Sequence, residues 1–261
     1  VGTTEKMSQW MSEIRADLRF PHQNSEQADI QIAHCPERVL PGYVIQKLVS
    51  NDRVIGGLTP YCAEQAKSLY QLFVKAEYII TDARTAEMAK LTENSFRDVN
   101  IAFANELSIV CDKLHINVWE LIKLANRHPR VNILKPGPWR VGGHCIAVDS
   151  WFIVDSAPDE ARLIRTTREV NDAKPEFILN KIRKVAEEFK HPKIALLGLT
   201  FKADIDDLRE SPAVGIAQQV IQDALGDVMI VEPHIRELPV QLQADNAQLV
   251  SLGESLDKAN I

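Results

Sequence analysis

The chain has 261 residues, of which 45% are hydrophobic, and it carries a formal net charge of -6 at pH 7. A chain of this length and composition can bury more than one hydrophobic core, so we expect a globular protein of two or more domains. The acidic balance, with no run of Lys and Arg interleaved with aromatic residues, argues against a nucleic-acid partner.

No apolar run approaches the roughly 20 residues that span a bilayer, and the N-terminus lacks the pattern of a signal peptide. The cysteines are irregularly spaced, with no CxxC pair and no histidines at ligand spacing: Cys35, Cys62, Cys111 and Cys145. We therefore predict neither a metal site nor a disulfide framework, and expect a cytoplasmic protein with no membrane partner.

The first 82 residues alternate strand and helix patterns, which is typical of an α/β sheet. The hydrophobic pattern predicts strands at residues 29–35, 53–57 and 77–81 and a helix at 59–76. The chain opens on a further helix, which Thr3 or Thr4 is placed to cap. No Gly-rich strand-to-helix turn comes before it, so we expect residues 1–82 to be the C-terminal part of an α/β domain.

A helical region is expected next, at residues 83–189. Residues 84–114 hold no Gly or Pro and repeat apolar residues at three- and four-residue steps, which predicts one long helix. Lys90 and Asn94 share a face of it, and two polar groups on such an apolar helix suggest a lined cavity; a solvated charge is the alternative for Lys90. Further helices are expected at 117–127 and 159–189, on either side of a loop at 137–150.

A second α/β unit begins at residue 190. An apolar strand runs into a loop, a helix follows with Pro212 in its first turn and Gly226 at its end, and a second strand comes next. The pattern ends at Ile261, one or two strands short of a usual domain of this kind, so we expect residues 190–261 to be a partial unit.

Cys145 is the candidate nucleophile of the 137–150 loop. The glycines before it, Gly142 and Gly143, allow a ligand to approach the backbone closely, although a free cysteine is usually an inert small hydrophobe. His144 is interpreted as structural or substrate-facing. Asp149 is placed to orient a water molecule or pair with a cation; a turn or cap carboxylate is the alternative.

Two cations mark the loop after the strand that begins the second unit. Lys202 follows the end of this strand, where open α/β sheets bind ligands, and Arg209 comes just before the next helix. A salt-bridged surface loop is the alternative interpretation.

Five stretches together resemble one family, the UDP-sugar 6-dehydrogenases, which oxidise the primary alcohol of a sugar nucleotide to a carboxylate with two NAD. In family order they read CPERVLPG, NDRVIGG, TAEMAKLTENSFRDVNIAFANE, VGGHCIAVD and GLTFKADIDDLRESP. The resemblance runs over essentially the whole chain. It implies a Rossmann-like NAD-binding domain, a helical dimerisation core and a Rossmann-like UDP-binding domain, the first and last of them partial here.

The resemblance also implies catalytic roles. Cys145 is expected to capture the aldehyde as a thiohemiacetal, which a second hydride transfer converts to a thioester that water hydrolyses. Lys90 is expected to stabilise negative charge on the reacting oxygen with help from Asn94, and Asp149 to assist proton transfer or activate water.

Substrate contacts are implied in the same way. Glu37 matches a glutamate near the sugar and the nicotinamide, and Pro41 replaces a second glutamate of the UDP-glucose enzymes, which favours an N-acetylated substrate, UDP-N-acetylmannosamine. Arg130 matches an arginine that reaches the sugar nucleotide across a subunit interface, so a homodimer or larger assembly is implied. Lys202 and Arg209 match residues that touch substrate and cofactor.

Several features depart from the family pattern. The Gly-rich NAD fingerprint and its acidic ribose ligand would precede Val1, a threonine usual before the VG turn is missing, and the end of the UDP-binding domain would follow Ile261. Trp139 and Arg140 look like an altered or inserted loop element, and Ser150 stands where a proline is usual.

These departures lead to the expectation that the 261 residues alone have no NAD-dependent activity. The implied function is the oxidation of UDP-N-acetylmannosamine to its uronate for surface polysaccharide synthesis. Two alternatives stay open: a non-catalytic fragment that keeps the dimer-forming helix, and a UDP-glucose dehydrogenase.

Overall fold

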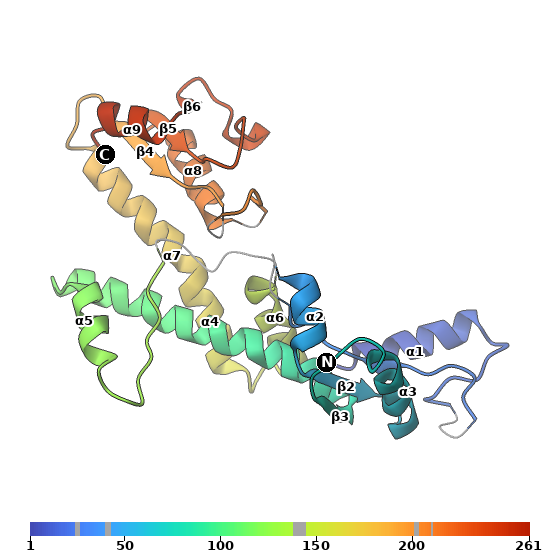
Figure 1. The fold of residues 1–261 in the computed structure, drawn as a ribbon. Helices are drawn as coiled ribbons and strands as arrows, with labels where there is room; N and C mark the ends of the chain where they lie inside the picture. Colours follow the sequence, from blue (N-terminus) through green and yellow to red (C-terminus); the bar gives the residue numbers. More distant parts are fainter. Residues whose placement is uncertain (24–26, 40–42, 138–144, 201–203, 210) are drawn as a thin grey trace. The chain divides into compact units, whose positions relative to one another are not determined.

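The computed structural model describes residues 1–261 except 24–26, 40–42, 138–144, 201–203 and 210. The chain forms two compact units, Val1–Asn94 and Ser95–Ile261 (Figure 1). The long helix α4, Ala83–Lys113, begins in the first unit and continues in the second. Within the described residues each unit carries a three-stranded sheet, so the α/β class expected from the sequence is confirmed.

The sheet of the first unit has the order β1-β2-β3 (Figure 1). β2, Arg53–Gly57, lies antiparallel to β1, Ala33–His34, and parallel to β3, Tyr78–Asp82. The predicted strand at 53–57 is confirmed, and β3 lies one residue further along than expected. β1 is much shorter than the strand predicted at 29–35, because its ladder reaches only Gly56 and Gly57 at the end of β2.

Helices α2, Val44–Ser50, and α3, Pro60–Tyr70, belong to the same unit. The α3 helix begins after Thr59, whose hydroxyl accepts the N–H of Cys62 at 3.1 Å, with Pro60 as the first helical residue. A Cβ on Gly57 would lie 2.3 Å from the Thr59 carbonyl oxygen, so glycine is required where β2 turns directly into α3.

The N-terminal helix α1, Thr3–Ile14, is not capped by Thr3 or Thr4, and that prediction is wrong. The residue before the helix is Gly2, and the carboxylate of Glu87 on α4 accepts the N–H groups at the start of the helix, which have no partner within it. Glu87 Oε1 lies 2.7 Å from Thr4 N and Oε2 lies 2.5 Å from Gly2 N. A carboxylate remote in sequence thus stabilises the positive end of the helix.

Helices form the first part of the second unit. The long helix predicted at 84–114 is confirmed by α4, and α5, Val118–Ala125, begins at Asn117, whose side chain accepts the N–H of Trp119 at 3.0 Å. The α7 helix, Arg162–Ala186, lies within the predicted 159–189 and includes Pro175.

Helix α6, Ile146–Ser156, begins within the predicted loop at 137–150, so that prediction is wrong for residues 146–150. The Gly-rich stretch before these residues favours a loop in the local sequence pattern. The segment IAVDSWFIVDS is strongly apolar, and one face of it contributes the buried residues Ser150, Ile153 and Val154.

The sheet of the second unit is parallel, with the order β4-β5-β6. Its elements in chain order are β4 (Lys193–Leu197), α8 (Pro212–Gln222), β5 (Asp227–Val231), the 3-10 turn η1 (Val240–Leu242), β6 (Ala247–Leu249) and α9 (Leu252–Lys258). Apolar residues of β4, β5 and α8 pack into one core with Leu179 of α7. The predicted strand, helix and strand of this region are confirmed.

The last residues of the chain lie along β4. The carbonyl oxygen of Ile261 accepts the N–H of Ala195 at 2.9 Å, and Asn260 N donates to Lys193 O at 3.0 Å. With β6 on the far side of β5, the described sheet is more complete than the two strands counted from the sequence.

Candidate active site

Cys145 is exposed and immediately precedes α6. Its carbonyl oxygen accepts the N–H of Asp149 at 2.8 Å, which is the first hydrogen bond of the helix. Asp149 therefore stands one helical turn beyond the cysteine and on the same face. The structure brings these two predicted residues together.

The other cysteines have less accessible thiols. Cys62 and Cys111 are buried, and the Cys62 thiol lies 3.1 Å from Thr59 Oγ1. Cys35 is partly buried, and desolvation raises the pKa of its thiol. Because the thiolate is the attacking form, exposure favours Cys145 among the four cysteines as the nucleophile.

Beneath α6 lies a set of buried polar residues that sequence reasoning missed. Ser150 Oγ donates to Asp98 Oδ2 at 3.0 Å, and Arg168 Nη1 donates to Asp98 Oδ1 at 2.7 Å. Burial raises the pKa of the Asp98 carboxyl, an effect that the Arg168 guanidinium opposes. Ser150, noted above as a departure from a usual proline, therefore supplies a hydrogen bond that a proline lacks.

A sequence signal for this set exists. Asp98 and Asn105 are seven residues apart on the apolar helix α4, and Arg168 and Asn171 are three apart on α7, so each pair shares a helix face. Only the tertiary structure shows that the two faces meet.

Lys90 and Asn94 lie on α4 within the first unit, with Lys90 half-buried and Asn94 buried. Glu93, on the same stretch of helix, forms an ion pair with Arg38 at 2.8 Å. Arg38 follows Glu37 directly, so this pair brings Glu37 and Arg38 next to the helical turn that carries Lys90. The structure thus places three predicted residues of the first unit in one region.

Glu37 is held by its own turn. Its Oε1 accepts the backbone N–H groups of Arg38 and Val39 at 2.6 and 2.7 Å. Its other oxygen lies 3.6 Å from Nη1 of Arg53, a buried arginine that also donates to the Leu48 carbonyl oxygen at 2.8 Å. Since the Glu37 side chain remains more than half exposed, it is oriented but still open to a ligand.

The loop after β4 is anchored by Glu232. Although burial by itself raises the pKa of this carboxyl, the N–H groups of Leu199, His234 and Thr200 hold it below its ordinary value. Glu232 Oε2 lies 2.8 Å from Leu199 N, so the anchor acts where β4 ends. Lys202 lies just beyond, outside the described residues.

Arg209 is strongly exposed, and its guanidinium forms two hydrogen bonds with Asp207, at 2.9 and 2.8 Å. This pairing resembles the salt-bridged surface loop that stood as the alternative interpretation, and a ligand would have to compete with Asp207 for the cation. Arg130 is exposed in the segment after α5, where its backbone N–H donates to His128 Nδ1 at 3.3 Å.

The remaining residues of the predicted site, Gly142, Gly143 and His144, lie outside the described residues, as do Pro41, Trp139 and Arg140. Among the described residues no cluster of three His, Cys, Asp or Glu side chains is arranged to hold a metal ion. In the same part of the chain, no helix combines the length and the apolar character that crossing a membrane requires.

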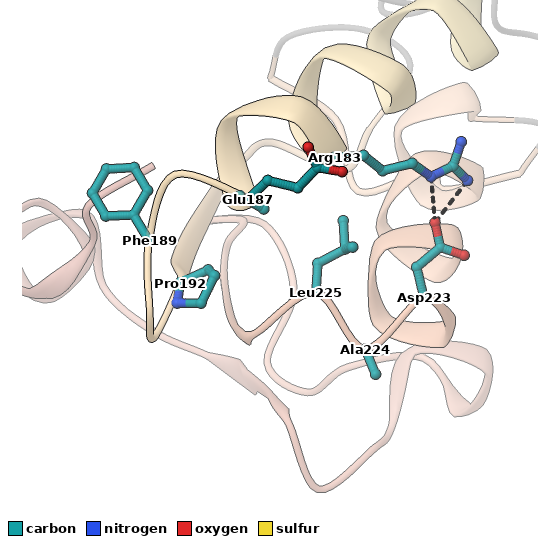
Figure 2. A pocket seen from close by; sticks show the side chains of 8 residues that line it. Arg183, Glu187, Phe189, Pro192, Asp223, Ala224 and Leu225 are labelled. Carbon is teal, nitrogen blue, oxygen red and sulfur yellow. Dashed lines mark hydrogen bonds and ion pairs between the residues drawn. The ribbon is translucent and has the colours of Figure 1, made fainter.

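A cavity of about 590 Å³ opens between the ends of α7 and α8 (Figure 2). Arg183 lines it and binds one oxygen of Asp223 through Nε at 2.7 Å and Nη2 at 2.6 Å. The remaining lining includes apolar groups of Phe189, Pro192 and Leu225. Because Asp223 neutralises the cation, this cavity is a poor phosphate site, and its lining includes no residue predicted for the active site.

Domain models of one family match the chain in three consecutive parts. They are the NAD binding domain of the UDP-glucose/GDP-mannose dehydrogenase family over residues 1–74, its central domain over 84–173 and its UDP binding domain over 195–261. The chain belongs to the UDP-glucose/GDP-mannose dehydrogenase family. The resemblance inferred from the five sequence stretches is thereby confirmed.

Individual relatives are similar over the full length of the chain. The chain is 63% identical to an NDP-N-acetyl-D-galactosaminuronic acid dehydrogenase of Ralstonia nicotianae, covering 100% of this chain and 61% of that protein. It is also 63% identical to a UDP-N-acetyl-D-mannosamine dehydrogenase of Campylobacter jejuni, covering 100% of this chain and 64% of the relative. The chain thus spans about three fifths of the length of these family members.

Solved structures of the family have a similar fold. A UDP-D-ManNAc dehydrogenase from Pyrococcus horikoshii superposes with a TM-score of 0.79 at 41% identity, over 90% of this chain and 55% of that one. Family membership therefore holds at the level of sequence, domain order and fold.

Proposed function

We propose that the protein is an NAD-dependent dehydrogenase that oxidises the primary alcohol of a UDP-linked N-acetylhexosamine to a carboxylate. The observation that carries the proposal is the exposed thiol of Cys145, with Asp149 one turn further along α6. It stands in a chain that matches, in order, the NAD-binding, central and UDP-binding domains of one dehydrogenase family.

The first unit fits part of an NAD site. β2 and β3 are parallel, so their carboxyl ends lie at one edge of the sheet, where open α/β sheets bind ligands. β2 leads through Gly57 and Thr59 into the N-terminus of α3, whose N–H groups favour a negatively charged group. This turn, with Glu37, would contact the dinucleotide, and NAD when bound accepts hydride from the substrate.

The side chains of the chain itself carry out the other steps of the reaction. The Cys145 thiol adds to the carbonyl carbon of the aldehyde, with its proton passing to the carbonyl oxygen, and so holds a thiohemiacetal. Loss of a second hydride and a proton leaves a thioester, which water cleaves to the carboxylate and the free thiol. Asp149 accepts a proton from that water, and Lys90 with Asn94 stabilises charge on the reacting oxygen.

Two substrates are favoured by particular observations. The 63% identical relatives are named for N-acetylmannosamine and N-acetylgalactosaminuronic acid chemistry, and both names contain an N-acetylated sugar. Pro41, where UDP-glucose enzymes have a glutamate, favours an N-acetylated sugar as well. We propose UDP-N-acetylmannosamine as the substrate and its C4 and C2 epimer, UDP-N-acetylgalactosamine, as the second candidate.

The cellular role and the assembly are part of the proposal. A sugar-nucleotide uronate is a precursor for surface polysaccharides, and four free cysteines suit the reducing cytoplasm. Phe96, Phe103 and Val110 are exposed at seven-residue spacing on α4, so they form one apolar stripe. We propose that a second copy of the chain covers this stripe, since exposed apolar area of this kind marks an interface.

The test is a coupled measurement of NADH and acid. The protein tested carries the 261 residues within a chain of the relatives' full length. It is incubated with NAD and, separately, with UDP-N-acetylmannosamine, UDP-N-acetylgalactosamine and UDP-glucose. We expect two NADH per acid formed with one of the N-acetylated sugars. The Cys145→Ser variant should form no acid yet still bind the sugar nucleotide, because its hydroxyl does not sustain the thioester step.

The matched control is Cys111→Ala, which removes a buried thiol far along α4 and should leave acid formation intact. Full acid production by Cys145→Ser would overturn the covalent mechanism. NADH formation only with UDP-glucose would favour the UDP-glucose alternative, and no NADH with any of the sugars would favour a non-catalytic protein.

A further inference from the structure

We propose that a buried polar network joining α4, α6 and α7 positions Cys145 by holding both ends of the segment that contains it. Asp98, Asn105 and Asn171 are then positioning residues: Asp98 and Asn171 act on the thiol through Ser150 and the first turn of α6, and Asn105 binds the backbone of Gly137. The inference rests on the proposed function of Cys145 as the nucleophile, and it concerns how that thiol is kept in place.

The end that follows Cys145 is held by Ser150. This residue lies in α6, is fully buried and donates from Oγ to Asp98 Oδ2 at 3.0 Å. Ser95 Oγ lies 3.2 Å from the same hydroxyl. Because Cys145 directly precedes the first turn of α6, a helix fixed at Ser150 also fixes the backbone of Cys145.

The end that precedes Cys145 is held by Asn105. Its Oδ1 accepts the backbone N–H of Gly137 at 3.1 Å. Gly137 is the last described residue before the segment 138–144, which lies outside the described residues. The two anchoring points thus flank the whole Gly-rich stretch and its cysteine.

Asn171 of α7 links the two anchors into one network. It accepts from Asn105 Nδ2 at 2.9 Å and donates from Nδ2 to Asp98 Oδ1 at 2.8 Å. Arg168, one turn earlier on α7, donates to the same Asp98 oxygen at 2.7 Å and to Asp172 at 2.5 Å. A continuous chain of hydrogen bonds therefore runs from Gly137 to Ser150 through side chains that solvent does not reach.

The burial of these groups argues for a role in geometry. Asp98, Asn105 and Asn171 are each 0% exposed. Buried polar groups cost desolvation, and apolar side chains of similar volume often stabilise a core equally well. Directional hydrogen bonds at both ends of a reactive segment do what apolar packing does not: they limit where the thiol can lie. A displacement of about 1 Å can cost on the order of a hundredfold in rate.

The experiment removes the hydrogen bond at each end of the segment with a separate substitution. Replacing Asp98 itself would leave the Arg168 charge buried and could unfold the protein, so the variants are Ser150→Ala and Asn105→Ala. Ser150→Ala removes a single hydroxyl and is the milder change. The matched control is Ile230→Val, which loosens the core of the second sheet without touching the network. Each protein is compared at a temperature equally far below its own Tm.

Two readouts are taken. The first is the rate at which iodoacetamide alkylates Cys145 in the native protein, followed by mass spectrometry, which needs no enzymatic activity. We expect both anchor variants to change this rate by about threefold or more, while Ile230→Val keeps the wild-type rate. The second is steady-state kinetics, where we expect kcat to fall about tenfold or more with KM for the sugar nucleotide within about twofold.

The outcomes separate this inference from the proposed function. Wild-type alkylation rates and kcat in both anchor variants would overturn the positioning role while leaving the dehydrogenase proposal intact. If the wild type forms no acid, the dehydrogenase proposal fails and the alkylation rates alone decide: unchanged rates refute the positioning role, and changed rates with an unaffected control support it. Equal losses in Ile230→Val would show a merely structural effect and would also overturn it.

Discussion

The carboxylate of Glu87 on α4 stabilises the start of α1, so replacing it should lower the stability of the protein. The Glu87 carboxylate accepts the N–H groups of Gly2, Thr3 and Thr4 and the hydroxyl of Thr4, at distances from 2.5 to 3.3 Å. It therefore performs, from another helix, the task of an N-cap residue. Glu87→Ala removes all of these bonds at once.

The loss in free energy of unfolding depends on which hydrogen bonds of Glu87 water can replace in the variant. Thr3 is exposed and Gly2 is half-exposed, so water can take over their N–H groups at small cost. Thr4 is only 9% exposed and loses both of its bonds, which costs about 1–3 kcal/mol for a buried group left unsatisfied. Loss of a cap costs about 1 kcal/mol. Since these two estimates overlap in part, we expect Glu87→Ala to reduce the free energy of unfolding by about 2 kcal/mol at pH 7.

The effect should depend on pH with a defined sign. Burial works to raise the pKa of Glu87, but the hydrogen bonds from Thr4, Gly2 and Thr3 prevail and lower it below its ordinary value of 4.5. A carboxyl whose pKa is lower in the folded state contributes stability that is fully present above 4.5 and is lost as the pH falls through the folded value. The difference between wild type and Glu87→Gln should therefore shrink on going from pH 7 to strongly acidic pH.

The assay is urea unfolding followed by circular dichroism, with hydrogen exchange of the α1 amides as a local readout. Glu106→Gln is the matched control, because it neutralises an exposed carboxylate on the same helix. Glu5 also titrates in acid, because hydrogen bonds with Arg84 lower its pKa while the charge of Glu87 raises it, so each variant is compared with wild type at the same pH. An α1 that exchanges equally slowly in Glu87→Ala and wild type at pH 7 would refute the capping role.

Two further predictions concern association and thiol reactivity. Phe103→Glu places a charge in the middle of the exposed α4 stripe and should shift the protein toward the monomer in sedimentation at micromolar concentration. The control Glu106→Gln should not cause this shift. Equal sedimentation of both variants and wild type would contradict the stripe as an interface. With limiting iodoacetamide, Cys145 should be alkylated first. Cys35 should react more slowly, because desolvation raises the pKa of its thiol. The buried residues Cys62 and Cys111 should react only after denaturation. Faster labelling of Cys35 than of Cys145 by mass spectrometry would contradict that order.

Much of the secondary structure could be predicted from local patterns. The uninterrupted apolar period of α4, the run Arg53–Gly57 and the Pro212 start of α8 are signals carried by neighbouring residues, so they survive in the tertiary structure. The family could also be inferred from the sequence, because its motifs consist of residues close together in the chain. Cys145 and Asp149, four residues apart, needed only a helix to bring them to one face.

The sequence misled where a distant partner decides the local structure. Thr3 and Thr4 have the chemistry of cap residues, yet the cap of α1 is a carboxylate more than 80 positions away. The glycines before Cys145 predict a loop that continues to residue 150, yet the segment after Cys145 buries one face and forms α6. Local propensity is a weak prior in both cases, because burial and remote hydrogen bonds contribute more free energy than the preference of one residue.

What the sequence by itself determined is which residues are proposed for the site: Cys145 as the nucleophile, Asp149 as its carboxylate neighbour and Lys90 on the long helix. Only the tertiary structure decided what surrounds them. Ser150, Asp98, Asn171 and Asn105 come from three helices. Their bonded pairs lie 52 to 73 positions apart in the sequence, so these hydrogen bonds exist only once the helices pack and exclude water. Periodicity tells which residues share a face of one helix, but the pairing of two faces depends on the packing of the whole unit.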